Sequence, residues 1–161
     1  MTDLEFCIVR RKAEVRAFVR VLKAIPRARL DYRPDPKART AAELAWLIVA
    51  EEAALVKLLD TGIVEWKDET PPASLDQMVA VYERHATAVD QRLAGLDYAG
   101  WEKQARFLVE GNGAWEDTVG QMAWGFLFDA VHHRGQLSTY LRPMGGKVPA
   151  IYGPSADDPG H

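Results

Sequence analysis

Cysteine is almost absent from this sequence. Cys7 is the only one among 161 residues, so an intramolecular disulfide and a cysteine-pair zinc site are both excluded. A single cysteine, in an apolar helical stripe where we expect it simply to pack, fits the reducing cytoplasm. No apolar run reaches the roughly 18 residues that a membrane span needs. The N-terminus begins with acidic residues and a helical pattern, unlike a signal peptide.

The motifs of several common enzyme classes are also missing. The chain has no glycine-rich phosphate loop, no GxSxG nucleophile elbow and no HExxH zinc motif. Any catalytic chemistry must therefore come from ionisable side chains that the fold brings together.

The composition is that of one ordinary folded domain, which we expect to cover residues 1–161: 48% of the residues are hydrophobic and 27% charged. The net charge of −3 is uneven, because residues 1–40 carry a balance of +6. Four basic residues fall at helical spacing within that region, namely Lys12, Arg16, Arg20 and Lys23. Without interleaved aromatic residues this face predicts a solvated helix surface rather than a nucleic-acid site.

Four helix-start signals divide the chain. Each is a serine or threonine followed three residues later by glutamate or glutamine: Thr2–Glu5, Thr40–Glu43, Ser74–Gln77 and Thr118–Gln121. In such a capping box the hydroxyl accepts from an amide of the first turn, and the later side chain bonds back to the cap. Because each signal precedes a long amphipathic segment, the sequence predicts four helices.

The predicted helices span about residues 3–25, 41–60, 75–95 and 119–142. Segment 63–73 contains two prolines and is expected to be a loop. Between the third and fourth helices, ARFLVE–GNG–AWED is a candidate short β-hairpin. The Pro/Gly-rich tail 145–161 is expected to lie extended over the bundle or to fray. The predicted fold class is all-α, a four-helix bundle with long connections.

The segment DAVHHRGQ, residues 129–136, holds the most informative pair of residues. Asp129 and His133 are four residues apart, so their Cβ atoms are expected about 5–6 Å apart on one helix face. The 3.6-residue periodicity places both on the bundle-facing stripe, with His132 and Arg134 pointing to either side. Two ionisable groups in an apolar helix must be satisfied by a site or by each other.

A third ionisable group can reach the same place. Glu51 continues the apolar stripe of the second predicted helix, so its carboxylate can point into the bundle. With Asp129 and His133 it would form a three-ligand metal site with open positions, as catalytic metals have. The alternative is an interior ion pair of Asp129 with His133 or Arg134 that braces two helices. Periodicity alone favours this alternative.

Two longer segments give the chain a family resemblance. RLDYRPDPKARTAAELAWLIVAEE and HHRGQLSTYLRPMGGKVPAIYGPSADD resemble the DinB/YfiT-like superfamily, and the likeness covers essentially the whole chain. That superfamily comprises four-helix-bundle proteins regarded as metal-dependent enzymes. The resemblance implies a divalent metal, nickel or zinc among them, held by three histidines. Relatives include thiol-dependent transferases and isomerases that use bacillithiol, mycothiol or glutathione.

Only one of the three implied ligand positions holds histidine here. His133 precedes Arg-Gly-Gln as in the family, but Asp129 stands at its partner position and Leu47 at the position on the second helix. In one explanation Glu51, one turn beyond Leu47, completes a rebuilt site for zinc, nickel or a harder cation such as manganese. In the other, no metal is bound. The loss of two imidazoles favours this second explanation.

The two explanations give two predicted functions. The favoured one is a metal-free or weakly metal-binding, stress-related protein that binds a small molecule or a thiol, and the alternative is a metal-dependent hydrolase or thiol S-transferase. We expect a homodimer and no membrane partner. The residues predicted to line the cleft are Leu47, His132, Gln136 and Tyr140. His132 could replace a ligand, but its direction on the helix differs from that of His133 by about 100°.

Overall fold

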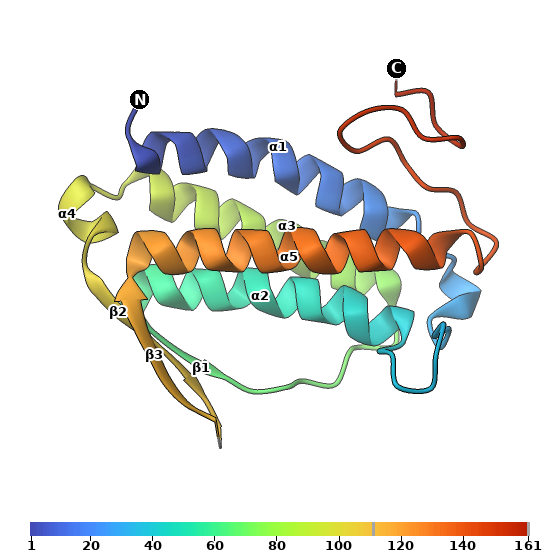
Figure 1. Cartoon of the computed structure of the whole chain (residues 1–161), viewed down its shortest axis with the longest axis horizontal. Coiled ribbons are helices and arrows are strands. Elements are labelled where there is room, and N and C mark those ends of the chain that lie inside the picture. Colours follow the sequence, from blue (N-terminus) through green and yellow to red (C-terminus); the bar gives the residue numbers. More distant parts are fainter. Residues whose placement is uncertain (111, 161) are drawn as a thin grey trace.

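The computed structural model describes residues 1–110 and 112–160 and is built around four long helices (Figure 1). They are α1 (Asp3–Lys23), α2 (Ala41–Thr61), α3 (Leu75–Ala94) and α5 (Val119–Leu141). Each lies within two residues of its predicted bounds. A 3-10 turn (Arg27–Arg29) and the short helix α4 (Tyr98–Trp101) are additional elements that the sequence pattern does not predict.

All four predicted hydroxyl caps form, since each accepts a hydrogen bond from the amide three residues on. Thr2 and Thr40 make the complete box, in which a glutamate bonds back to the amide of the cap at 2.7 Å. The full boxes predicted at Ser74 and Thr118 are wrong. In these two boxes the side chain that should bond back to the cap amide is a glutamine. A neutral glutamine is stabilised less than a carboxylate by the positive end of the helix dipole, so this bond is weaker.

The all-α prediction is too narrow, because three strands form a sheet beside the helices. They are β1 (Ile63–Trp66), β2 (Gln104–Val109) and β3 (Gly113–Thr118), in the order β1-β2-β3. β2 pairs antiparallel with β3, and the predicted turn GNG includes residue 111, which lies outside the described residues. β1 pairs parallel with β2, where the sequence predicted only a loop. A four-residue strand that pairs across a whole helix leaves little local signal.

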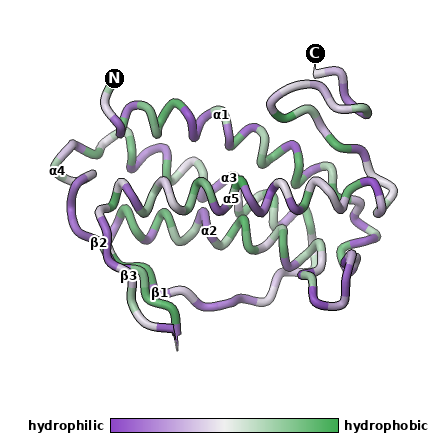
Figure 2. Tube along the Cα trace, viewed as in Figure 1, coloured by the Kyte–Doolittle hydropathy of each residue, from purple (hydrophilic) through white to green (hydrophobic). Residues whose placement is uncertain are grey.

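The interior consists of two hydrophobic clusters along the bundle, and the hydropathy of each helix alternates accordingly (Figure 2). Cys7 belongs to the cluster near the sheet and is fully buried, and this burial raises the pKa of its thiol to about 11. Within residues 1–110 and 112–160, no helix combines the length and apolar character needed to cross a membrane.

In the described part of the chain, two buried pairs of an arginine and a glutamate each connect two helices, and neither was predicted from the sequence. Arg11 of α1 donates to Glu52 of α2 at 2.5 Å. Arg134 of α5 donates to Glu14 of α1 at 2.6 Å, and both side chains are almost completely buried. Arg134 points to a different side of α5 from His133, as the periodicity predicts, but the alternative in which it pairs with Asp129 is wrong: Arg134 turns towards α1, where the buried carboxylate of Glu14 is available.

The tail has no regular secondary structure but is fastened to the bundle (Figure 1). The hydroxyl of Tyr152 accepts from Arg134 at 2.6 Å and donates to Glu14 at 3.0 Å. Arg142, just after α5, donates to Asp157 at 2.9 Å. These bonds explain why a Pro/Gly-rich segment holds one path over the helices; residue 161, predicted as part of the tail, lies outside the described residues.

Candidate functional site

Two helices bring the three predicted ligands together. Asp129 and His133 lie one turn apart on α5, and Glu51 lies on the facing helix α2. One ligand atom from each can be chosen so that all lie within 4.8 Å of one another. Helical periodicity predicted that these side chains point into the bundle from two helices, and in the structure they meet at one place.

A hydrogen bond connects the two helices at this cluster. Nδ1 of His133 and Oε1 of Glu51 lie 2.6 Å apart, and the opposite ring nitrogen, Nε2, lies 3.9 Å from Oδ1 of Asp129. The side chain of Glu51 is only 3% exposed, whereas that of Asp129 is 60% exposed. The prediction of two inward-facing α5 ligands thus holds for His133 alone, because Asp129 lies at the rim.

The surroundings shift the protonation of both inner groups. Burial raises the pKa of Glu51 to about 7; the hydrogen bond to His133 opposes this rise, and the charge of Asp129 adds to it. The hydrogen bond to Glu51 raises the pKa of His133, with burial and the charge of Arg39 acting in the opposite direction. Near neutral pH the pair therefore holds a proton that a metal ion would have to displace.

A pocket of about 350 Å³ opens onto these groups. We call it the site pocket. It is lined by residues of α2, the segment before it, α5, β1 and β2: Arg39, Leu47, Glu51, Trp66, Phe107, Val109, Phe126, Asp129 and His133. Leu47 forms part of the wall one turn before Glu51, and it leaves the three ligand groups accessible to one another.

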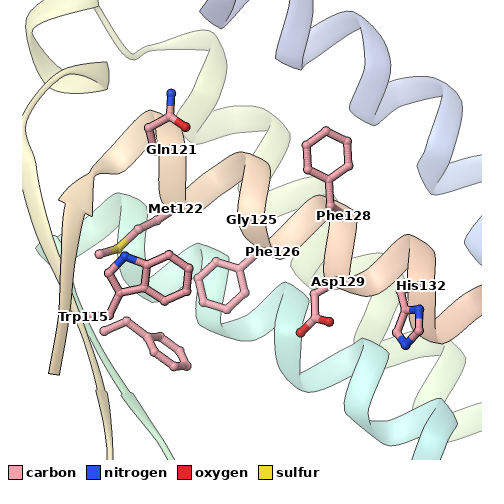
Figure 3. A pocket seen from close by; sticks show the side chains of 9 residues that line it. Trp115, Gln121, Met122, Gly125, Phe126, Phe128, Asp129 and His132 are labelled. Carbon is pink, nitrogen blue, oxygen red and sulfur yellow. The ribbon is translucent and has the colours of Figure 1, made fainter. Parts of the chain in front are cut away.

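The other predicted cleft residues are dispersed. His132 is exposed, accepts a hydrogen bond from the side-chain amide of Gln136 at 2.9 Å, and lines a neighbouring pocket (Figure 3). Gln136 is exposed beside it. Tyr140 is buried and donates to the carbonyl of Arg39 at 3.1 Å, two turns beyond His133. Of the four residues predicted to line the cleft, only Leu47 lines the site pocket itself.

The wall opposite the helices is a part of the site that no sequence pattern predicted. Trp66, Phe107 and Val109 come from β1 and β2, and these strands cover the site pocket from the side. Arg39 was missed because it lies in the connector before α2, where no periodicity assigns a direction. The alternation of apolar and polar residues in β2 predicts a strand with one face towards the helices. Its partner β1 was predicted to be a loop, so the sheet wall could not be predicted.

The donor set fits a divalent cation. Two carboxylates and one imidazole are borderline-to-hard ligands, which suit zinc, manganese or related ions. Oε2 of Glu51 is buried and has no hydrogen-bond partner among the described residues, a costly state for a carboxylate oxygen. An ion at the cluster would satisfy this oxygen.

Comparison with solved structures supports the same fold. A DinB-like protein from Bacillus cereus is 23% identical, with a TM-score of 0.76, covering 92% of this chain and 97% of its own. A DinB-like protein from Bacillus subtilis is 15% identical, with a TM-score of 0.66 and coverages of 88% and 92%. None of the curated proteins searched matches this chain.

A third similar structure comes from a larger protein. The mycothiol-dependent maleylpyruvate isomerase is 13% identical with a TM-score of 0.50, and the match covers 91% of this chain but 62% of the isomerase. Such likeness concerns the fold alone. The profile of the DinB family matches residues 8–160, nearly the whole sequence, and the chain therefore belongs to the DinB family.

Proposed function

We propose that Glu51, Asp129 and His133 hold a divalent metal ion, and that the protein uses this ion to act on a small molecule in the site pocket, as a hydrolase or a thiol S-transferase. The observation that carries the proposal is the convergence of three ligand groups within 4.8 Å, from two helices, at the wall of a pocket. Three protein ligands leave positions for water or substrate, which is the usual arrangement of catalytic metals.

The three proposed ligands differ in burial, and this difference indicates different roles. Glu51 and His133 are held rigidly between α2 and α5, whereas the exposed Asp129 faces the pocket and is free to adjust to an arriving ion. A bound ion would supply the acidification of a water or thiol at neutral pH. The likeness to a mycothiol-dependent isomerase makes a thiol a reasonable co-substrate to test.

Metal titration tests the site. Protein purified without a metal-affinity tag and treated with EDTA should gain thermal stability when Mn²⁺, Zn²⁺ or Ni²⁺ is added. At a hundredfold excess over Kd, the gain should be about 5–10 °C for a chain of this size. Glu51→Gln, Asp129→Asn and His133→Gln should each remove most of this gain.

The adjacent histidine offers a matched control. His132→Gln removes an exposed imidazole one residue away that is outside the three-residue cluster, and it should leave the metal-induced shift unchanged. An equal melting temperature with EDTA and with all three metals would contradict the proposal. So would a loss in His132→Gln as large as that in His133→Gln.

Metal affinity should depend on pH in a definite direction. Since burial raises the pKa of Glu51 to about 7 and the bond to Glu51 raises that of His133, protons compete with the ion below neutrality. Affinity should rise by about tenfold per pH unit for each displaced proton between pH 6 and 7, and level off above the pKa values. Isothermal titration in buffers of different ionisation enthalpy counts the released protons. An affinity that does not change with pH would contradict these assignments.

The metal-free alternative also has a specific observation in its favour. The 2.6 Å bond between His133 and Glu51 already partners both groups without an ion. On this view the family's histidine site is degraded at Leu47 and Asp129, and the stress-related protein binds a small molecule without turnover. It predicts unchanged ligand binding in EDTA.

Placing histidines at the two other family ligand positions tests whether these positions face the site. Leu47→His combined with Asp129→His should raise zinc and nickel affinity, because Leu47 lines the same pocket as the three ligand groups. Because the two new histidines would bind the metal directly, metal affinity should rise by more than the roughly 10–100-fold that residues hydrogen-bonded to the ligands contribute. Gly135→His adds an exposed imidazole elsewhere on α5 and should give no gain. If the double variant also gains nothing, position 47 does not face the metal.

A further inference from the structure

A second pocket, of about 510 Å³, lies beside the site pocket, between β2–β3 and α5 (Figure 3). We call it the aromatic groove. Its walls carry Phe107, Trp115, Met122, Phe126 and Phe128. Trp115 and Phe128 are 63% and 65% exposed, which is unusual for large apolar side chains. Exposed apolar surface gathered in a hollow of this size is typical of ligand-binding sites.

The aromatic groove is continuous with the proposed metal site. Phe107, Phe126 and Asp129 line both the groove and the site pocket. Asp129 is also one of the three proposed ligands, so it stands at the junction of the two pockets. Figure 3 shows its carboxylate one step along α5 from the rings of Trp115 and Phe126, whereas the ring of Phe128 points away from them. A molecule that fills the groove therefore reaches the metal cluster with one end.

The site pocket, which begins at that junction, has a positively charged side chain in its wall. Arg39 contributes to its wall, is exposed, and acts electrostatically on His133. Its guanidinium makes no hydrogen bond or ion pair with any described residue; only its backbone carbonyl is bonded, by Tyr140. The exposed carboxylate of Glu43 interacts with Arg39 electrostatically but does not bond to it. An arginine at the wall of a pocket whose guanidinium makes no hydrogen bond to the protein is well suited to bind a carboxylate or another planar anion.

The charges of the site agree with an anionic ligand. The two positive charges of a divalent ion would balance the carboxylates of Glu51 and Asp129. Arg39 then keeps its charge for a ligand, since the exposed carboxylate of Glu43 acts on it electrostatically without forming an ion pair. A neutral ligand, or a second copy of the chain that merely covered Trp115 and Phe128, would make no use of this charge.

We propose that the substrate of this site is a small anion with an aromatic or extended apolar body. The body lies in the aromatic groove, the anionic group binds Arg39, and the reacting bond lies between them, next to Asp129. This inference rests on the proposed function for the reacting centre, but the two binding contacts can be tested without any metal.

A series of matched compounds measures both contacts. The probes are ω-phenylalkanoates with acyl chains of three to eight carbons, the corresponding ω-phenylalkanols, and butyrate. Dissociation constants are measured by isothermal titration, once with Mn²⁺ or Zn²⁺ and once with EDTA. At the best chain length the acid should bind about tenfold more tightly than the alcohol, as expected for one charge-assisted hydrogen bond. Butyrate, which lacks the ring, should bind weakly or not at all.

Paired variants assign each contact to its residue. Arg39→Gln should remove the preference for acid over alcohol, whereas Arg16→Gln, an exposed arginine of α1, should not. Trp115→Ala should weaken acid and alcohol equally, by about tenfold. Tyr98→Ala removes an aromatic ring of the same 63% exposure outside the groove and should change neither.

Several results would overturn the inference. They are equal affinity for acid and alcohol, an equal effect of the Arg39 and Arg16 variants, or a dimer that Trp115→Ala converts to monomers without any probe binding. The last result would make the groove an interface between two copies. Probe binding that depends on Arg39, in a protein whose melting temperature does not respond to any of the three metals, would refute the metal site and keep the substrate class; a metal-induced shift without probe binding would do the reverse.

Discussion

Replacing Arg134 by methionine should lower the free energy of unfolding by about 3 kcal/mol, near the lower end for breaking a buried ion pair. Arg134 and Glu14 are 2% and 4% exposed, so the variant leaves a carboxylate buried beside an apolar side chain. Arg10 still reaches Oε1 of Glu14 at 2.8 Å, which keeps the loss from being larger. Urea denaturation measures the change.

Two further variants make this result specific. Arg27→Met breaks an ion pair with Asp76 in which both side chains are about two-thirds exposed, so it should lower the free energy of unfolding far less than Arg134→Met does. Arg134→Met combined with Glu14→Leu should recover most of the loss, because apolar replacement of a whole buried pair is often neutral. If Arg134→Met costs no more than Arg27→Met, the buried pair does not stabilise the fold as its geometry indicates.

Gly120→Ala should destabilise the protein by about 1–3 kcal/mol, or roughly 4–10 °C in melting temperature. Gly120 is buried in the first turn of α5, and a Cβ atom there would meet the indole of Trp101 well inside van der Waals contact. The indole cannot easily move, since Trp101 is 1% exposed and its N–H donates to Asp3 at 3.0 Å. Either the helix or the ring must shift.

The same helix provides the control. Gly135 is exposed in the middle of α5, and no atom outside its immediate surroundings lies within 4 Å of an added Cβ. Gly135→Ala should therefore raise the free energy of unfolding by about 0.5–1 kcal/mol through helix propensity alone. Opposite signs for the two substitutions would attribute the loss in Gly120→Ala to the close approach of Trp101. Equal signs would contradict it.

Local signals in the sequence were enough for the helices and for part of the site. Hydroxyl caps and 3.6-residue periodicity located the long helices, and the same periodicity pointed Glu51 and His133 towards each other across two of them. These signals work because each depends on residues close together in the chain. The family resemblance added the identity of the ligand positions and the expectation of a metal.

Features that depend on distant pairing were not predictable in this way. The β1 strand exists only because β2, which follows α3 in the chain, supplies its partner. Arg134 lies next to His133 in the sequence, but its direction depends on Glu14, 120 residues away. The exposure of Asp129 depends on how much of α5 the sheet covers. In each case the deciding contact lies outside any local pattern.

His133 and Arg134 are neighbours in the chain that serve opposite sides of α5. His133 faces α2 and the site pocket, whereas Arg134 faces α1 and the tail through Glu14 and Tyr152. In evolution, the side that faces the pocket is therefore selected for chemistry, and the side that faces α1 is selected for stability of the fold. Substitutions at the ligand positions can accumulate on one side of the helix while the other side keeps the scaffold intact. Such a helix can acquire or lose a chemistry without first losing its fold.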